Sequence, residues 1–148
     1  MAKFNFNFQG ILNIKEKLEE QKKIDLGNAT KYLTAQQQIL IVHKSSLMEK
    51  QKEFYIKNGT SMYVKELVEL SKAIKYYEEQ VKTQSAIVEM AKKKVEEKRK
   101  LLVKAVIEKK TYEKLKEIAL EEYLKSEELA NQKQLDELSS FKVSKRQE

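Results

Sequence analysis

The sequence contains no cysteine, no proline and no tryptophan, and it has only three glycines in 148 residues. Without cysteine the chain can form neither disulfides nor thiolate metal sites, and this composition fits a reducing compartment. Without proline, and with so little glycine, it has few places to turn or to interrupt a helix. It also has no run of eighteen apolar residues, and no apolar stretch typical of a signal peptide at its N-terminus. We therefore predict a soluble, intracellular and almost entirely helical protein.

Large apolar residues recur every seven positions on both sides of the segment Asn58-Gly59-Thr60-Ser61. The first series is Leu26, Leu33, Leu40, Leu47 and Phe54, and the second is Leu67, Ile74, Val81, Val88, Val95 and Leu102. A seven-residue repeat sustained over this length predicts a coiled coil. The apolar residues suffice for a narrow seam between helices, and not for a globular core.

The two series are in register if the chain reverses at residues 58–61. Leu47 then faces Ile74 and Leu40 faces Val81, and the two residue numbers in every facing pair add up to 121. In the layers between, where the numbers add up to 120, the facing pairs are Ala29–Ala91, Gln36–Gln84, His43–Tyr77 and Lys50–Leu70. Small or polar residues thus mostly face one another, which penalises a slipped register. The pattern predicts an antiparallel coiled-coil hairpin.

The predicted fold is all-α, with a single domain over residues 1–148. We expect helix one at about 8–57, the turn at 58–61, helix two at about 62–138 and a disordered tail at 139–148. Helix two would then extend past its partner after about residue 118.

The first residues of the chain are harder to interpret. Residues 2–9 alternate between apolar and polar, but with no second strand available we interpret them as the frayed start of helix one. The spacing of eight between Leu18 and Leu26 predicts a local slip of the seam. Helical spacing there predicts an apolar face of Phe4, Phe8, Ile11, Ile14 and Leu18. The same pairing rule places Phe8 opposite Tyr112 and Phe4 opposite Leu115 or Lys116.

Charge is distributed unevenly along helix two. Residues 92–116 hold eleven Lys or Arg against four Glu, whereas residues 117–137 hold two Lys against seven acids. The basic segment is interpreted either as a solvated helix face or as a docking surface for an acidic partner. Binding to nucleic acid is a further alternative, although the interleaved glutamates and the acidic neighbouring segment argue against it. A generic structural coiled-coil adaptor is also compatible with the pattern.

Catalytic motifs are absent from the sequence. It has no glycine-rich phosphate loop, no Gly-x-Ser-x-Gly and no His-Glu-x-x-His. The single histidine, His43, falls on the seam opposite Tyr77, which is typical of a polar layer rather than of a catalytic base. We predict no enzymatic activity, no metal, no cofactor and no small-molecule substrate.

Aromatic residues gather near the predicted turn. A two-helix coil cannot enclose large rings on all sides, so some of these residues and their apolar neighbours should stay partly exposed as anchors for a protein partner. The residues concerned are Leu47, Phe54, Leu70, Ala73 and Tyr77.

Two segments of the chain resemble the FliJ family, the small coiled-coil components of the bacterial flagellar type III export apparatus. The opening Phe6-Asn-Phe8-Gln9-Gly-Ile11-Leu12-Asn-Ile-Lys15, followed by Glu19-Glu20, resembles the start of that family. Lys114-Leu115-Lys116, Glu121-Glu122-Tyr123 and the closing Gln132-Lys133-Gln134-Leu135-Asp136-Glu137 resemble its end. The resemblance covers nearly the whole chain, and Gly10 and the lysine-rich centre depart from the family pattern.

The resemblance implies a function. FliJ-like proteins resemble the γ stalk of rotary ATPases, promote assembly and activity of the hexameric export ATPase, contact the membrane export gate and escort export chaperones. It therefore implies a cytoplasmic protein that is peripherally associated with the inner-membrane export apparatus. We also expect a monomer, because a hairpin that is complete in itself needs no second chain. The residues implied for the ATPase are Phe8, Ile11, Leu12, Lys98, Arg99, Lys100, Leu135, Asp136 and Glu137. Those implied for the gate are Leu47, Phe54, Leu70, Ala73 and Tyr77.

Overall fold

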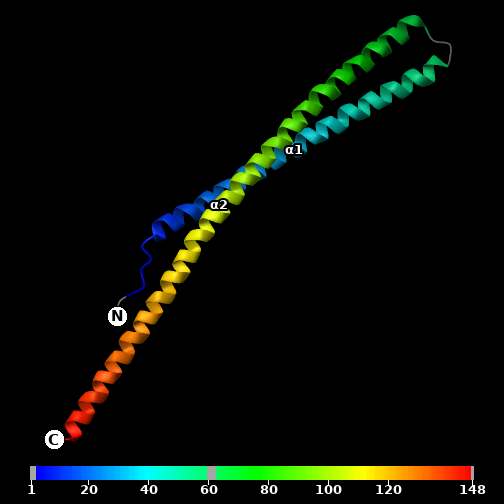
Figure 1. The fold of residues 1–148 in the computed structure, drawn as a ribbon. Coiled ribbons are helices and arrows are strands. Elements are labelled where there is room, and N and C mark those ends of the chain that lie inside the picture. The colour runs from blue at the N-terminus through cyan, green and yellow to red at the C-terminus, as the bar shows by residue number, and fades with distance from the viewer. Residues whose placement is uncertain (1–2, 60–62, 148) are drawn as a thin grey trace. The chain divides into compact units, whose positions relative to one another are not determined.

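The computed structural model describes residues 3–59 and 63–147, which form two long helices (Figure 1). Helix α1 spans Gln9–Asn58 and helix α2 spans Val64–Arg146. The prediction of an all-α hairpin whose second helix is the longer one is confirmed. The predicted turn falls partly on residues 60–62, which lie outside the described residues, and the prediction of a single domain stays a prediction.

Helix α1 begins later than the frayed start that we predicted. Residues 3–8 are not helical, and the Gln9 amide donates a hydrogen bond to the Phe6 carbonyl at 3.1 Å. The Leu12 amide donates to the Phe8 carbonyl at 2.9 Å, which closes the first helical turn. The segment before α1 is nonetheless packed, because the Phe6 side chain is buried.

Helix α2 continues to Arg146, beyond residue 138 where we predicted its end and a disordered tail after it. No glycine or proline follows residue 138 to stop the helix. Lys145 and Arg146 in the last turn oppose the helix dipole favourably, and the Lys145 ammonium lies 5.1 Å from the centre of the Phe141 ring. These interactions favour the last turns of the helix.

The chain divides into two compact units, each containing part of both helices. The hairpin unit comprises Gln21–Val103, and the terminal unit comprises Met1–Glu20 with Lys104–Glu148. The two units are described in turn.

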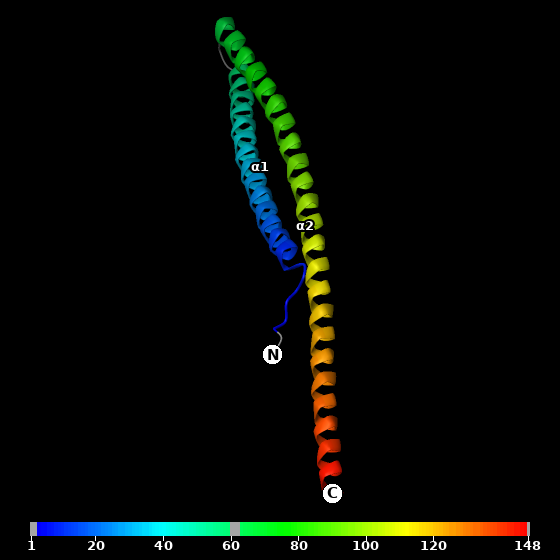
Figure 2. The same ribbon diagram turned by 90° about the vertical axis from the view of Figure 1, so that its left-hand side faces the viewer.

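In the hairpin unit the two helices lie side by side (Figures 1 and 2). None of the residues in the two predicted series with a repeat of seven is exposed, and Val88 and Val95 are buried. The Gln84 side-chain amide donates hydrogen bonds to the Gln36 main-chain carbonyl at 3.0 Å and to its side-chain carbonyl at 2.7 Å. The predicted register is therefore confirmed at the Gln36–Gln84 layer.

In the terminal unit the predicted pair Phe8–Tyr112 is confirmed, with ring centroids 6.3 Å apart. The predicted inward face is wrong at Ile14, which is 64% exposed, whereas Leu12 is 3% exposed. Buried Leu12 and Glu19 stand fourteen and seven positions before Leu26, so the repeat of seven has no slip there. The sequence analysis missed that the repeat of seven continues because one of its positions holds a charged residue, Glu19.

The predicted pairing of Phe4 is also wrong. Its ring lies 5.4 Å from that of Tyr123, well past Leu115 and Lys116. Non-helical chain advances up to about 3.3 Å per residue, against about 1.5 Å in a helix. Four residues back from Phe8 thus cover about 13 Å, comparable to the roughly 16 Å of α2 between Tyr112 and Tyr123.

Candidate partner-binding surfaces

Two ion pairs hold the terminal unit together across the helices. The Lys15 ammonium lies 2.9 Å from the Glu108 carboxylate, and its hydrogen bond holds the pKa of Glu108 below the usual value. Buried Glu19 pairs with Lys109, and this hydrogen bond is the main cause of the raised pKa of Lys109. Lys109 stands seven positions after Leu102, so each of the two series with a repeat of seven includes one charged residue, and these two opposite charges meet.

Beyond Tyr123, no other described segment of the terminal unit lies beside helix α2 (Figures 1 and 2). Every residue from 128 to 147 is exposed. The helix positions that would continue the α1-facing stripe hold small or polar residues: Ser126, Ala130, Lys133 and Glu137. The stripe therefore has no large apolar residue at these four positions, while the helix itself continues to Arg146.

A different face of α2, from Glu117 onward, carries leucines and glutamates. Positions separated by three, four or seven residues share one side of a helix. Leu124, Leu135 and Leu138 are 56%, 66% and 57% exposed. We call the following residues the extension face: Glu117, Glu121, Leu124, Glu128, Leu135 and Leu138.

The residues implied for the ATPase do not form one cluster. Phe8 and Ile11 are 46% and 38% exposed, while Leu12 is buried and serves packing within the terminal unit. Leu135 is exposed but stands 23 residues beyond Tyr112, on the order of 35 Å along α2 from the ring that contacts Phe8. Asp136 and Glu137 are also exposed.

The implied basic residues belong to the hairpin unit. Arg99 and Lys100 are exposed and Lys98 is half-buried. The Arg99 guanidinium lies 3.2 Å from the carboxylate of Glu96 on the same helix. The interleaved glutamates thus partly neutralise this basic segment, as the sequence suggested.

The expectation that the residues implied for the gate stay partly exposed is correct for four of them and wrong for one. Leu47, Phe54, Ala73 and Tyr77 are half-buried. Leu70 is 8% exposed, because it occupies the seam itself.

More accessible apolar residues lie beside the seam on α1, and our sequence analysis missed them. Ile41 and Met48 are each 57% exposed and Tyr55 is 84% exposed. These three residues, which we call the α1 stripe, are themselves spaced by seven, and each stands one position after a residue of the first apolar series. Met48 and Tyr55 border a shallow hollow. The second series of spacing seven was the signal that could have revealed them.

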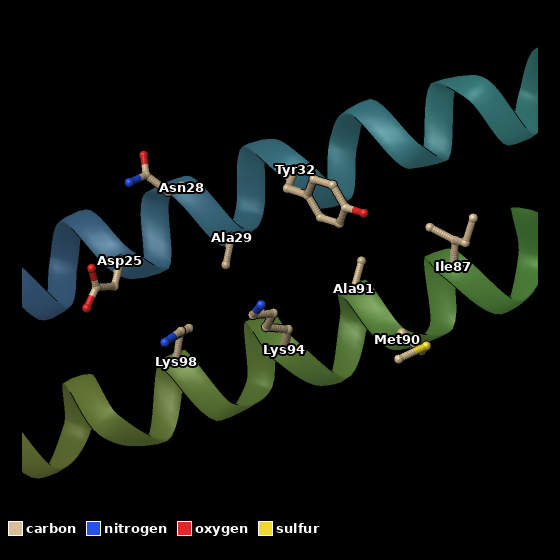
Figure 3. Close-up of a pocket in the computed structure, with 9 residues that line it drawn as sticks. All are labelled: Asp25, Asn28, Ala29, Tyr32, Ile87, Met90, Ala91, Lys94 and Lys98. Atoms are coloured by element: carbon tan, nitrogen blue, oxygen red, sulfur yellow. The ribbon is translucent and has the colours of Figure 1, made fainter.

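A larger groove, of about 640 Å³, lies between α1 and α2 in the hairpin unit (Figure 3). Its floor is the layer where Ala29 faces Ala91, two side chains too small to fill the space between the helices. We call it the Ala29–Ala91 groove. Its lining also includes Asp25, Asn28, Tyr32, Ile87, Met90, Lys94 and Lys98.

The described part of the chain offers no other chemistry of note. Within residues 3–59 and 63–147, no three His, Cys, Asp or Glu side chains lie together as a metal site would require. Neither helix, over its described length, has a stretch apolar enough to cross a membrane.

Comparison with known proteins gives one family. The family model described as flagellar FliJ protein matches residues 4–148. No curated protein matches the chain significantly, and no solved structure does.

Proposed function

The chain belongs to the flagellar FliJ family, which makes it a component of the flagellar export apparatus, and on that premise we propose that it is a non-enzymatic coupling protein of this apparatus. It promotes assembly and activity of the hexameric export ATPase, links the ATPase to the membrane export gate and escorts export chaperones. The observation that carries the proposal is the family match over residues 4–148.

The terminal unit is the part proposed to contact the ATPase. An exposed helix without a neighbour can enter a ring and contact its subunits, and α2 is of this kind after Tyr123. Leu135, Asp136 and Glu137 are the contacts proposed there, with Phe8 and Ile11 at the base of the unit. A single helix inside a sixfold ring contacts the subunits unequally, which favours different conformations in different subunits.

The test mixes the protein with the export ATPase of the same organism. Hydrolysis and hexamer formation should both rise, and no change in either would refute the proposal. Leu135→Asp should reduce the stimulation by about tenfold or more, the loss expected when a charge enters an apolar contact worth 1.4 kcal/mol or more. Leu129→Asp is the matched control, because Leu129 is 67% exposed against 66% for Leu135 and lies on another face of the helix.

The hairpin unit is the part proposed to contact the gate, through the α1 stripe together with half-buried Leu47 and Phe54. Exposed apolar side chains in a row are typical anchors for a protein partner. Binding of the soluble domain of the gate protein should weaken with Tyr55→Ser, and not with Tyr63→Ser. The two tyrosines have similar exposure, 84% and 80%, so equal losses would argue against the α1 stripe.

A further inference from the structure

The Ala29–Ala91 groove has an apolar floor, two lysines on its α2 side and one acid, Asp25, on its α1 side, where the Lys22 ammonium lies 4.0 Å from the Asp25 carboxylate. Ala29 and Ala91 form the floor, and Met90 beside them is 71% exposed. Lys94 and Lys98 stand one helical turn apart on the α2 side of the groove (Figure 3). A helix that presents a large apolar side chain between carboxylates would match both features.

The extension face has this pattern. Leu124 has Glu121 three positions before it and Glu128 four positions after it, and these spacings place all three side chains on one side of the helix. Both glutamates and the leucine are exposed. The segment 117–137 holds seven acids against two lysines, and the segment 92–100 that borders the groove holds six basic residues against two glutamates.

We propose that the Ala29–Ala91 groove of one copy receives the extension face of a second copy. Leu124 fills the space over the two alanines, and the carboxylates of Glu121 and Glu128 meet the ammonium groups of Lys94 and Lys98. This occupant is favoured over a different protein because its charge and its apolar pattern are both complementary to the groove. The proposal departs from our sequence-based expectation of a monomer and goes beyond the proposed export function.

The contact should be weak and sensitive to salt. A leucine on an alanine floor buries little area, so attraction between exposed charges contributes much of the association. Such charges are screened within about 10 Å at about 0.1 M salt and within about 3 Å at about 1 M. We therefore expect the association constant to fall at least about tenfold between about 0.05 M and about 0.5 M sodium chloride.

Sedimentation equilibrium of the full chain tests the proposal. The average mass should rise above the 17.4 kDa of one chain as protein concentration increases. A groove variant, Lys94→Glu with Lys98→Glu, should remain at the mass of one chain, and so should an extension variant, Glu121→Lys with Glu128→Lys. All four substituted residues are exposed or half-buried, and unchanged helicity by circular dichroism verifies that each variant is folded.

Mixing the two variants gives the sharpest result. At the contacting positions the groove variant has acids on both surfaces and the extension variant has lysines on both, whereas the mixture again places opposite charges there. The mixture should therefore associate although neither variant does so by itself. The control variant Lys72→Glu with Lys82→Glu changes the same charge at exposed lysines of α2 that do not line the groove, and it should associate like the original chain. A constant mass of one chain at all concentrations, or a mixture that does not associate, would overturn the proposal.

Discussion

Replacing Gln84 with alanine tests how the helices of the hairpin unit keep their register. Gln84 is 7% exposed and donates two hydrogen bonds to Gln36, one to the main chain and one to the side chain. A net contribution of about 1 kcal/mol for each bond gives a loss of about 2 kcal/mol in the free energy of unfolding. Gln36→Ala removes the side-chain acceptor and leaves the main-chain carbonyl, so it should cost about half as much.

Urea and thermal unfolding followed by circular dichroism would measure both losses. At this chain length about 1 kcal/mol corresponds to about 2–4 °C, so Gln84→Ala should lower Tm by about 4–8 °C. In the Gln84→Ala background, Gln36→Ala should cost almost nothing further, since its partner is already gone. Gln38→Ala is the control, because Gln38 is exposed on the same helix and its loss should stay within about 0.5 kcal/mol. If Gln36→Ala cost as much as Gln84→Ala, the assignment of two bonds to one donor would be refuted.

Three further predictions concern single side chains. Leu12→Ala should lower the free energy of unfolding by about 2–5 kcal/mol and Ile14→Ala by less than about 1 kcal/mol, because Leu12 is 3% exposed and Ile14 is 64% exposed. Chemical denaturation would measure both losses, and equal losses would contradict the burial of Leu12 rather than Ile14. Because the pKa of Glu108 is lowered in the folded chain, its pairing with Lys15 stabilises the fold at pH values above 4.5, the ordinary pKa of a glutamate, and this stability is lost as pH falls through the folded pKa. Carboxyl titration by NMR should show that the pKa of Glu108 rises in Lys15→Ala. An unchanged pKa would exclude the ion pair in solution. Gly27→Ala should raise the free energy of unfolding by about 0.5–1 kcal/mol, since Gly27 is helical and a Cβ at this position meets nothing within 4 Å. Thermal unfolding would measure the change, and a lower Tm would contradict the open space around Gly27.

The sequence was sufficient for the architecture and the register because a repeat of seven reports directly on which helix positions face each other. The pair Gln36–Gln84 follows from position numbers alone. The interpretation of the repeat was wrong where one of its positions holds a charged residue, since Glu19 could not be recognised as buried without its partner Lys109. Phe4 was misplaced for another reason: the advance per residue changes where a helix gives way to irregular chain, and periodicity carries no information about that.

The partner-binding surfaces were less predictable than the fold. The sequence analysis assigned partner contacts to residues such as Leu70 that the seam consumes, because interface anchors and coil layers have the same composition. Exposure separates the two classes, as Tyr55 shows, and exposure depends on how far a side chain stands from the seam. The Ala29–Ala91 groove likewise required the structure, since two facing alanines indicate a small layer but not the space above it.

The fixed pairing of positions across the hairpin unit also constrains how this protein can evolve. Gln36 and Gln84 lie 48 positions apart in the sequence, yet a change at one alters the fitness of every residue at the other. Substitutions in this layer should therefore be inherited as compensated pairs, for instance both glutamines giving way to apolar residues together. Among descendants of this sequence, covariation between positions would trace the coil as a line of pairs whose numbers have a constant sum, while the extension face would vary with whatever it binds.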